Sequence, residues 1–107
     1  MKPTVELIFD ATCPHVDAAR EQIREALVRA GQSTEWTEWE RSAPNSPAYV
    51  RRYASPSVLV AGRDVVGGAP LDAGSGCRLY RDTNGAPIAA PTAQMILAAL
   101  SMPGASR

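Results

Sequence analysis

The chain has few of the residues that build a covalent scaffold. It contains only two cysteines, Cys13 and Cys77, among its 107 residues. Two thiols are too few for a disulfide-rich scaffold and too few for a four-thiolate metal site. In a reducing compartment the default for such a pair is two unlinked thiols. A joint role for the two cysteines would therefore be catalytic or regulatory rather than structural.

An excess of charge of one sign is also lacking. The 11 basic and 11 acidic residues give a formal net charge of zero. This balance argues against bulk electrostatic capture of nucleic acid or of an anionic membrane, so neither is expected as a partner. No apolar run approaches the roughly 20 residues of a membrane-spanning helix. No small-residue cleavage site follows the short apolar segment near the N-terminus, so we expect no signal peptide and a cytoplasmic location.

What is present is the composition of an ordinary globular domain, with 45% hydrophobic and 21% charged residues. The length predicts one domain with a modest core. We expect the domain to span residues 1–102 and residues 103–107 to form a disordered tail.

Hydrophobic patterning predicts an alternation of strands and helices. An apolar stripe at helical spacing, which includes Val16, Ala19 and Ile23, indicates the first helix. Trp36 and Trp39 lie on opposite faces of the second strand, which is typical of an edge strand. The expected strands are 4–9, 34–40, 57–61 and 63–66; the expected helices are 15–30, 48–53 and 92–101, the last with Pro91 in its first turn; a hairpin of 77–81 and 86–89 is expected around an Asn-Gly turn.

Candidate chemistry begins in the stretch "FDATCPHV", residues 9–16. If Pro14 occupies the first helical position, Cys13 is the N-cap residue or its neighbour. A thiol there faces unpaired backbone N–H groups and the positive end of the helix dipole, which favour the nucleophilic thiolate. His15, the only histidine, would add positive charge when protonated. The alternatives are an inert cysteine with Thr12 as the cap, a solvated His15, and an Asp10 that only shapes the turn.

A second stretch, "ASPSVLVAGRDVVGG" at residues 54–68, has a proline opening an apolar strand, a glycine turn, a second strand and a Gly-Gly pair. Together with "ATCPHV" it resembles the thioredoxin and glutaredoxin superfamily. The resemblance implies an α/β thioredoxin-like fold, with a mixed four-stranded sheet flanked by helices and a small extra hairpin before the last helix. It implies a cis Pro56 against the active Cys13, with Ser55 before the proline. It also implies that Gly67 and Gly68 lie near the position of glutathione's charged end.

More narrowly, the chain is similar to small bacterial thioredoxin-like proteins that carry a cysteine-proline start and a late "CRLY" segment. Some of these are labelled as linked to mercury or organomercurial handling. The chain departs from the dithiol pattern, because Val16 stands where the second cysteine of a Cys-x-x-Cys pair would be. Cys77 is the alternative partner if its Cα lies within about 7 Å of that of Cys13. Otherwise Cys77 is a small buried hydrophobic residue.

The favoured function is that of a thiol-dependent redox protein, with thiol-disulfide oxidoreductase as the candidate enzyme class. Cys13 would be the nucleophile, Cys77 a resolving thiol and His15 a modulating group. A thiol or disulfide would be the substrate, with glutathione as a cosubstrate and no resident cofactor. The substrate-binding candidates are Thr12, Pro14, Ser55, Pro56, Gly67 and Gly68.

Two other functions stay open. In the first, the thiolates of Cys13 and Cys77 hold a soft metal such as mercury, copper or zinc. In the second, the chain is a non-catalytic interaction module that forms a homodimer through its tryptophan-bearing edge.

Overall fold

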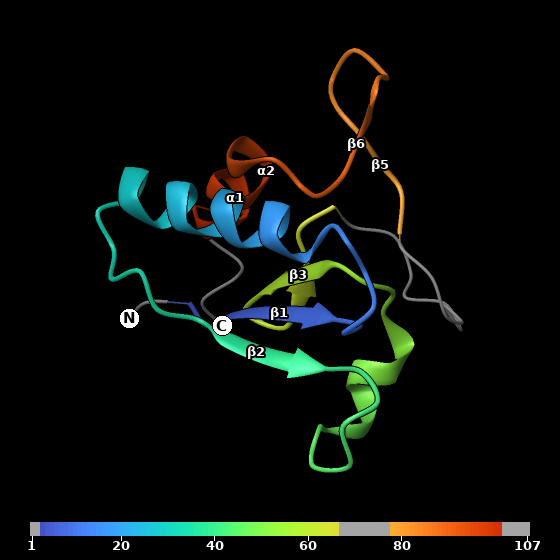
Figure 1. Ribbon diagram of the computed structural model, residues 1–107. Helices are drawn as coiled ribbons and strands as arrows, with labels where there is room; N and C mark the ends of the chain where they lie inside the picture. Colours follow the sequence, from blue (N-terminus) through green and yellow to red (C-terminus); the bar gives the residue numbers. More distant parts are fainter. Residues whose placement is uncertain (1–2, 67–77, 102–107) are drawn as a thin grey trace.

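The computed structural model describes residues 3–66 and 78–101. This part of the chain is a mixed α/β structure, and the predicted order of elements is confirmed (Figure 1). In chain order the elements are β1 (Val5–Phe9), α1 (Val16–Arg29), β2 (Thr37–Glu40), the 3₁₀ helix η1 (Ala48–Arg52), β3 (Ser57–Val60), β4 (Arg63–Asp64), β5 (Tyr80–Arg81), β6 (Pro87–Ile88) and α2 (Ala93–Leu100).

Four strands form one mixed sheet in the order β2-β1-β3-β4. β1 runs parallel to β2 and antiparallel to β3, and β4 returns antiparallel to β3. β1 therefore lies inside the sheet, and the predicted edge position of β2 is confirmed. β2 is shorter than predicted: it begins at Thr37, which pairs with Glu6, the second residue of β1.

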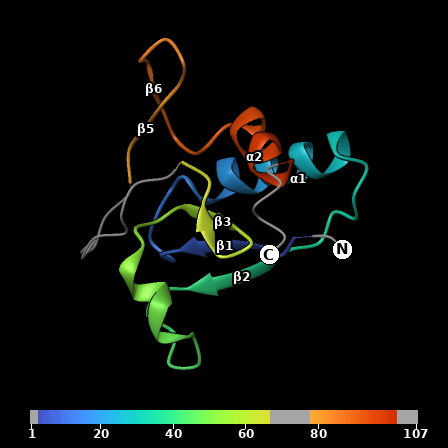
Figure 2. The same cartoon turned by 180° about the vertical axis from the view of Figure 1, so that it is seen from behind.

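The two faces of the sheet are covered differently. Side chains alternate along β1, so that Leu7 belongs to the core beneath the helices and Ile8 to the opposite face. The helices α1 and α2 lie together on the first face, and η1 lies on the other (Figures 1 and 2). Trp36 packs on the helix side and Trp39 on the η1 side, which confirms their predicted opposite faces.

α1 forms along the predicted stripe, but its start differs from the prediction. The helix begins at Val16 with His15 as the N-cap residue, so Pro14 is not at the first helical position. Cys13 is therefore two residues before the N-cap, and neither Cys13 nor Thr12 is the cap. The reason is a closed turn at Asp10, whose carbonyl accepts from the Cys13 N–H and whose carboxylate accepts from the Thr12 N–H.

The predicted hairpin is confirmed, because β5 and β6 pair with each other as a separate two-stranded sheet. Gly85 of the Asn-Gly turn has φ +84°, a conformation that glycine adopts without strain. α2 follows, with Thr92 as its N-cap residue, because the Thr92 hydroxyl accepts from the Met95 N–H at 3.1 Å. Pro91 therefore precedes the cap, and its predicted place in the first turn is wrong.

Several predictions lie outside the described residues. These are the loop at 67–76, the position of Cys77 and the tail at 103–107. Within residues 3–66 and 78–101, no helix combines the length and the apolar character needed to cross a membrane.

Candidate site around Cys13

Cys13 lies in the connection between the end of β1 and the start of α1. Its side chain joins the helix-side core, with 9% of the residue exposed. Its Sγ atom lies 3.9 Å from the carbonyl oxygen of Ser55, within the range of a weak S–H···O hydrogen bond. The structure thus brings the candidate nucleophile to the residue just before Pro56.

Ser55 and Pro56 are both buried, immediately before β3. The peptide bond between them is cis, as the resemblance implied. β3 begins beside Cys13 and runs antiparallel to β1. Of the residues predicted from the two sequence stretches, Cys13, Ser55 and Pro56 therefore come together at one end of the sheet.

Two residues missed by sequence reasoning also reach this point. The backbone N–H of Arg78 donates to the Ser55 carbonyl at 2.5 Å. The Tyr80 hydroxyl donates to the Pro56 carbonyl at 2.6 Å. Nothing in the local sequence distinguishes Arg78 or Tyr80 as part of this site. Their contacts arise where the chain returns to the sheet, so no short-range signal was available to find them.

The Arg78 side chain holds this segment of the chain against the sheet. Its guanidinium pairs with the Asp64 carboxylate of β4 and donates to the Ser57 hydroxyl at 3.0 Å. It also lies over the Tyr80 ring, 4.7 Å from the ring centroid. Tyr80 is almost fully buried, and this burial raises the pKa of its hydroxyl well above the usual value. The Tyr80 hydroxyl is therefore a proton donor throughout the neutral range.

Two carboxylates organise the turn that carries Cys13. The Asp10 carboxylate accepts from the Thr12 N–H at 2.9 Å and from the Thr12 hydroxyl at 2.7 Å. These hydrogen bonds lower the pKa of Asp10. The Glu40 carboxylate accepts from the Ala11 N–H at 3.2 Å and from Ser42, and the Ser42 side chain is the main cause of its lowered pKa. Asp10 thus shapes the turn, the role named for it in the sequence analysis.

Two polar atoms near the thiol in sequence or space lack a hydrogen-bond partner among the described residues. They are the hydroxyl oxygen of Ser55 and Nδ1 of His15, and both atoms are buried. His15 is the N-cap residue, yet its side chain makes no capping hydrogen bond. Buried polar atoms without partners are rare in folded proteins and cost stability. Both groups therefore retain hydrogen-bonding capacity, one on the residue whose carbonyl contacts the Cys13 sulfur and one two residues after Cys13.

The remaining predicted residues divide into two sets. Thr12 and Pro14 are exposed and flank Cys13 in the turn. Gly67, Gly68 and Cys77 lie outside the described residues. In the part of the chain that the structure describes, no three or more His, Cys, Asp or Glu side chains gather in a way that would hold a metal ion.

Comparison of the chain with protein-family models, with curated proteins and with solved structures finds no significant match. The functional interpretation consequently rests on the residues around Cys13 and on their contacts.

Proposed function

We propose that the protein is a thioredoxin-like thiol protein whose reactive group is the Cys13 thiol. One observation carries the proposal: the Cys13 Sγ lies 3.9 Å from the carbonyl of Ser55, the residue that precedes the cis Pro56. The course of β3, which starts beside Cys13 and runs antiparallel to β1, supports the same fold. So does the placement of both α-helices on one face of the sheet.

The proposed reaction is thiol-disulfide exchange. The Cys13 thiolate attacks one sulfur of a substrate disulfide, and the S–S bond breaks. A mixed disulfide forms on Cys13, and the other half of the substrate leaves as a thiolate that takes up a proton. A second thiol then attacks the mixed disulfide, which releases Cys13 and forms a new disulfide. Glutathione or Cys77 would supply that second thiol.

The described residues support Cys77 as the internal candidate. Arg78, the residue after Cys77 in the sequence, donates its backbone N–H to the same Ser55 carbonyl that the Cys13 thiol contacts. Thr12, Pro14, Ser55 and Pro56 would border the bound substrate. The resemblance adds Gly67 and Gly68, which lie outside the described residues.

The test is a titration with reduced and oxidised glutathione, followed by mass spectrometry of each cysteine. The parent chain, Cys13→Ser and Cys77→Ser are compared under native conditions. In the parent we expect Cys13 to form a mixed disulfide with glutathione or a disulfide with Cys77, at a defined redox potential. The Cys77→Ser chain is the matched control, in which Cys13 should still take up glutathione. In Cys13→Ser the exchange activity should disappear.

Two outcomes would contradict the proposal. The first is a Cys13 that stays reduced across the whole titration in the folded parent. The second is exchange activity that survives in Cys13→Ser.

A further inference from the structure

Residues 78–80, named here the cap segment, donate hydrogen bonds to two successive carbonyl oxygens just before β3. The Arg78 N–H donates to the Ser55 carbonyl, and the Tyr80 hydroxyl donates to the Pro56 carbonyl. The Ser55 carbonyl is also the group that the Cys13 thiol contacts. The cap segment therefore shares an acceptor with the thiol.

The cap segment is anchored on one side and open on the other. Arg78 and Tyr80 point toward the sheet, whereas Leu79 between them is 79% exposed. This alternation is that of an extended strand laid along the start of β3. The Arg78 guanidinium pairs with Asp64, whose side chain is only 6% exposed, so that this ion pair is shielded from water. Four polar contacts, to Ser55, Pro56, Ser57 and Asp64, thus hold the cap segment against β3 and β4.

The cap segment leads into a hairpin with few ties to the rest of the protein. β5 and β6 pair only with each other among the described strands. Both views show the hairpin projecting from the molecule at the end where α1 begins (Figures 1 and 2). Separation of the cap segment from β3 would therefore break its own anchors and leave the four-stranded sheet intact.

We propose that the cap segment is an autoinhibitory contact that closes the Cys13 site. A disulfide-bearing substrate reaches the thiol of Cys13, a residue that is 9% exposed, only after residues 78–80 leave the Ser55 and Pro56 carbonyls. Opening frees the Ser55 carbonyl next to the sulfur, where the substrate's own N–H donor can bind. This inference builds on the proposed function, because it concerns access to the same thiol.

The test measures the alkylation rate of Cys13 by iodoacetamide in folded protein. Every chain carries Cys77→Ser, so that only Cys13 reacts. Tyr80→Phe removes the anchor on Pro56, and Asp64→Asn weakens the anchor of Arg78. Loss of one such buried hydrogen bond or charge predicts alkylation about tenfold faster than in the parent.

Two matched controls separate opening from general destabilisation. Leu79→Ser changes the cap segment at a side chain that makes no anchor. Tyr49→Phe removes a tyrosine hydroxyl that donates to Glu6, on the far face of the sheet. Both controls should alkylate within about twofold of the parent, because neither affects the start of β3. Parent-like rates in both folded anchor variants would overturn the proposal.

Hydrogen exchange in the parent provides a measurement that needs no variant. The Arg78 amide should exchange through local opening, faster than the β1 and β3 amides. Exchange of the Arg78 amide only through global unfolding would also overturn the proposal. Faster alkylation in the anchor variants, together with a Cys13 that never takes up glutathione, would support the autoinhibitory contact and contradict the redox function. Glutathione uptake by Cys13, together with parent-like alkylation rates in the anchor variants, would support the redox function and contradict the autoinhibitory contact.

Discussion

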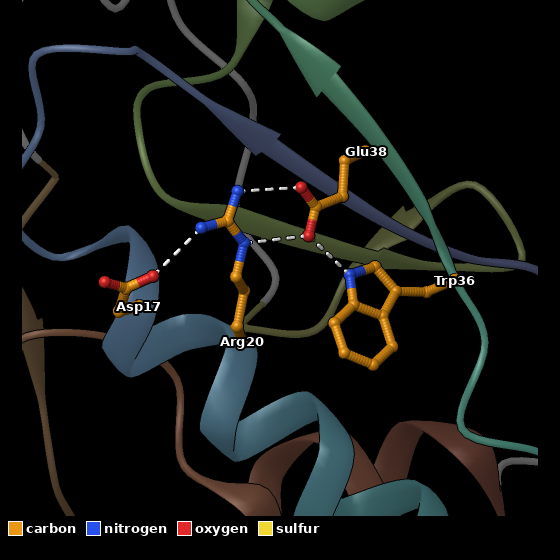
Figure 3. Close-up of polar contacts among 4 residues, drawn as sticks. All are labelled: Asp17, Arg20, Trp36 and Glu38. Atoms are coloured by element: carbon orange, nitrogen blue, oxygen red, sulfur yellow. Dashed lines mark hydrogen bonds and ion pairs between the residues drawn. The ribbon is translucent and has the colours of Figure 1, made fainter.

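The Arg20 guanidinium of α1 donates two hydrogen bonds to the Glu38 carboxylate of β2, at 2.9 and 3.0 Å (Figure 3). The same guanidinium pairs with Asp17 at 2.9 Å, and the Trp36 indole N–H donates to Glu38 at 2.9 Å. The fork of Arg20 matches the two oxygens of Glu38, the arrangement that gives arginine–carboxylate pairs their directionality. This pair joins the first turns of the helix that follows Cys13 to the edge of the sheet.

We expect a double-mutant cycle of Arg20→Ala and Glu38→Ala to give a coupling free energy of about 1 kcal/mol, because the pair is bidentate and half-buried. Urea unfolding of the four proteins measures it. The matched control is the exposed pair of Glu25 and Arg29 on the same helix, where a coupling of roughly 0.3–0.5 kcal/mol is expected. A coupling at Arg20 and Glu38 no larger than in the control pair would contradict this prediction.

The same pair predicts a dependence of stability on pH. The hydrogen bonds from Arg20 lower the pKa of Glu38 below its ordinary value of 4.5. A carboxyl whose pKa is lower in the folded state stabilises the fold above its ordinary pKa, and this contribution is lost as the pH falls through the lowered value. In Glu38→Gln the loss of stability below about pH 4.5 should be shallower than in the parent. Asp10 and Glu40 titrate in both proteins, so the difference isolates Glu38.

Local patterns predicted the elements whose formation depends on neighbouring residues. The apolar run of β1 and the stripe of α1 are of this kind, and so is the Asn-Gly turn of the hairpin. The predicted places of Pro14 and Pro91 in the first helical turn were wrong, because hydrogen bonds between nearby side chains and the backbone set where each helix begins. Asp10 closes a turn before α1, and the Thr92 hydroxyl caps α2.

The site was predictable only in part. The sequence stretches around Cys13 and Pro56 indicated that these residues meet, through the family resemblance. The contribution of Arg78 and Tyr80 depends on where the chain returns after residue 77, and no local periodicity encodes that return. Side chains that act across the fold on backbone carbonyls leave no pattern in the sequence around them.

A buried carboxylate on the opposite face predicts an alkaline transition. Glu6 is buried and accepts from the Trp39 indole N–H at 2.8 Å and from the Tyr49 hydroxyl. Tyr49 is 39% exposed, but partial desolvation of its hydroxyl first, and then the hydrogen bond to Glu6, raise the pKa of Tyr49 to about 12. A raised pKa stabilises the folded state below the ordinary value of 10.0, and this contribution is lost as the pH rises toward 12.

Tyr49→Phe tests this relationship. At pH 7 the variant should lose about 1 kcal/mol of unfolding free energy, because the Glu6 carboxylate loses the Tyr49 hydroxyl as a hydrogen-bond donor. Between pH 10 and 12 the parent should lose stability more steeply than the variant. Denaturant unfolding across this range measures both effects. Tyr53 and Tyr80 are present in both proteins, so equal slopes would show that the Tyr49 hydroxyl does not titrate in this way.

Ser55 offers a test in which stability and function should move in different directions. Its side chain is fully buried, and its hydroxyl oxygen has no hydrogen-bond partner among the described residues. Removal of such a hydroxyl is neutral or stabilising for a fold. Ser55→Ala should therefore unfold at an unchanged or higher urea concentration. It should form the Cys13 mixed disulfide more slowly, because the residue whose carbonyl contacts the sulfur would lose its free hydroxyl.

Ser57→Ala is the matched control two residues away. The Ser57 hydroxyl donates to the Ala54 carbonyl at 2.6 Å and accepts from Arg78 at 3.0 Å, so its loss should lower the unfolding free energy by about 1 kcal/mol. If Ser55→Ala is destabilised as much as Ser57→Ala, the Ser55 hydroxyl has a structural partner. If Ser55→Ala is stable and reacts with glutathione disulfide at the parent rate, the hydroxyl has no part in the reaction. Slow reaction in a fully stable Ser55→Ala would show that the hydroxyl acts in the reaction and not in the stability of the fold.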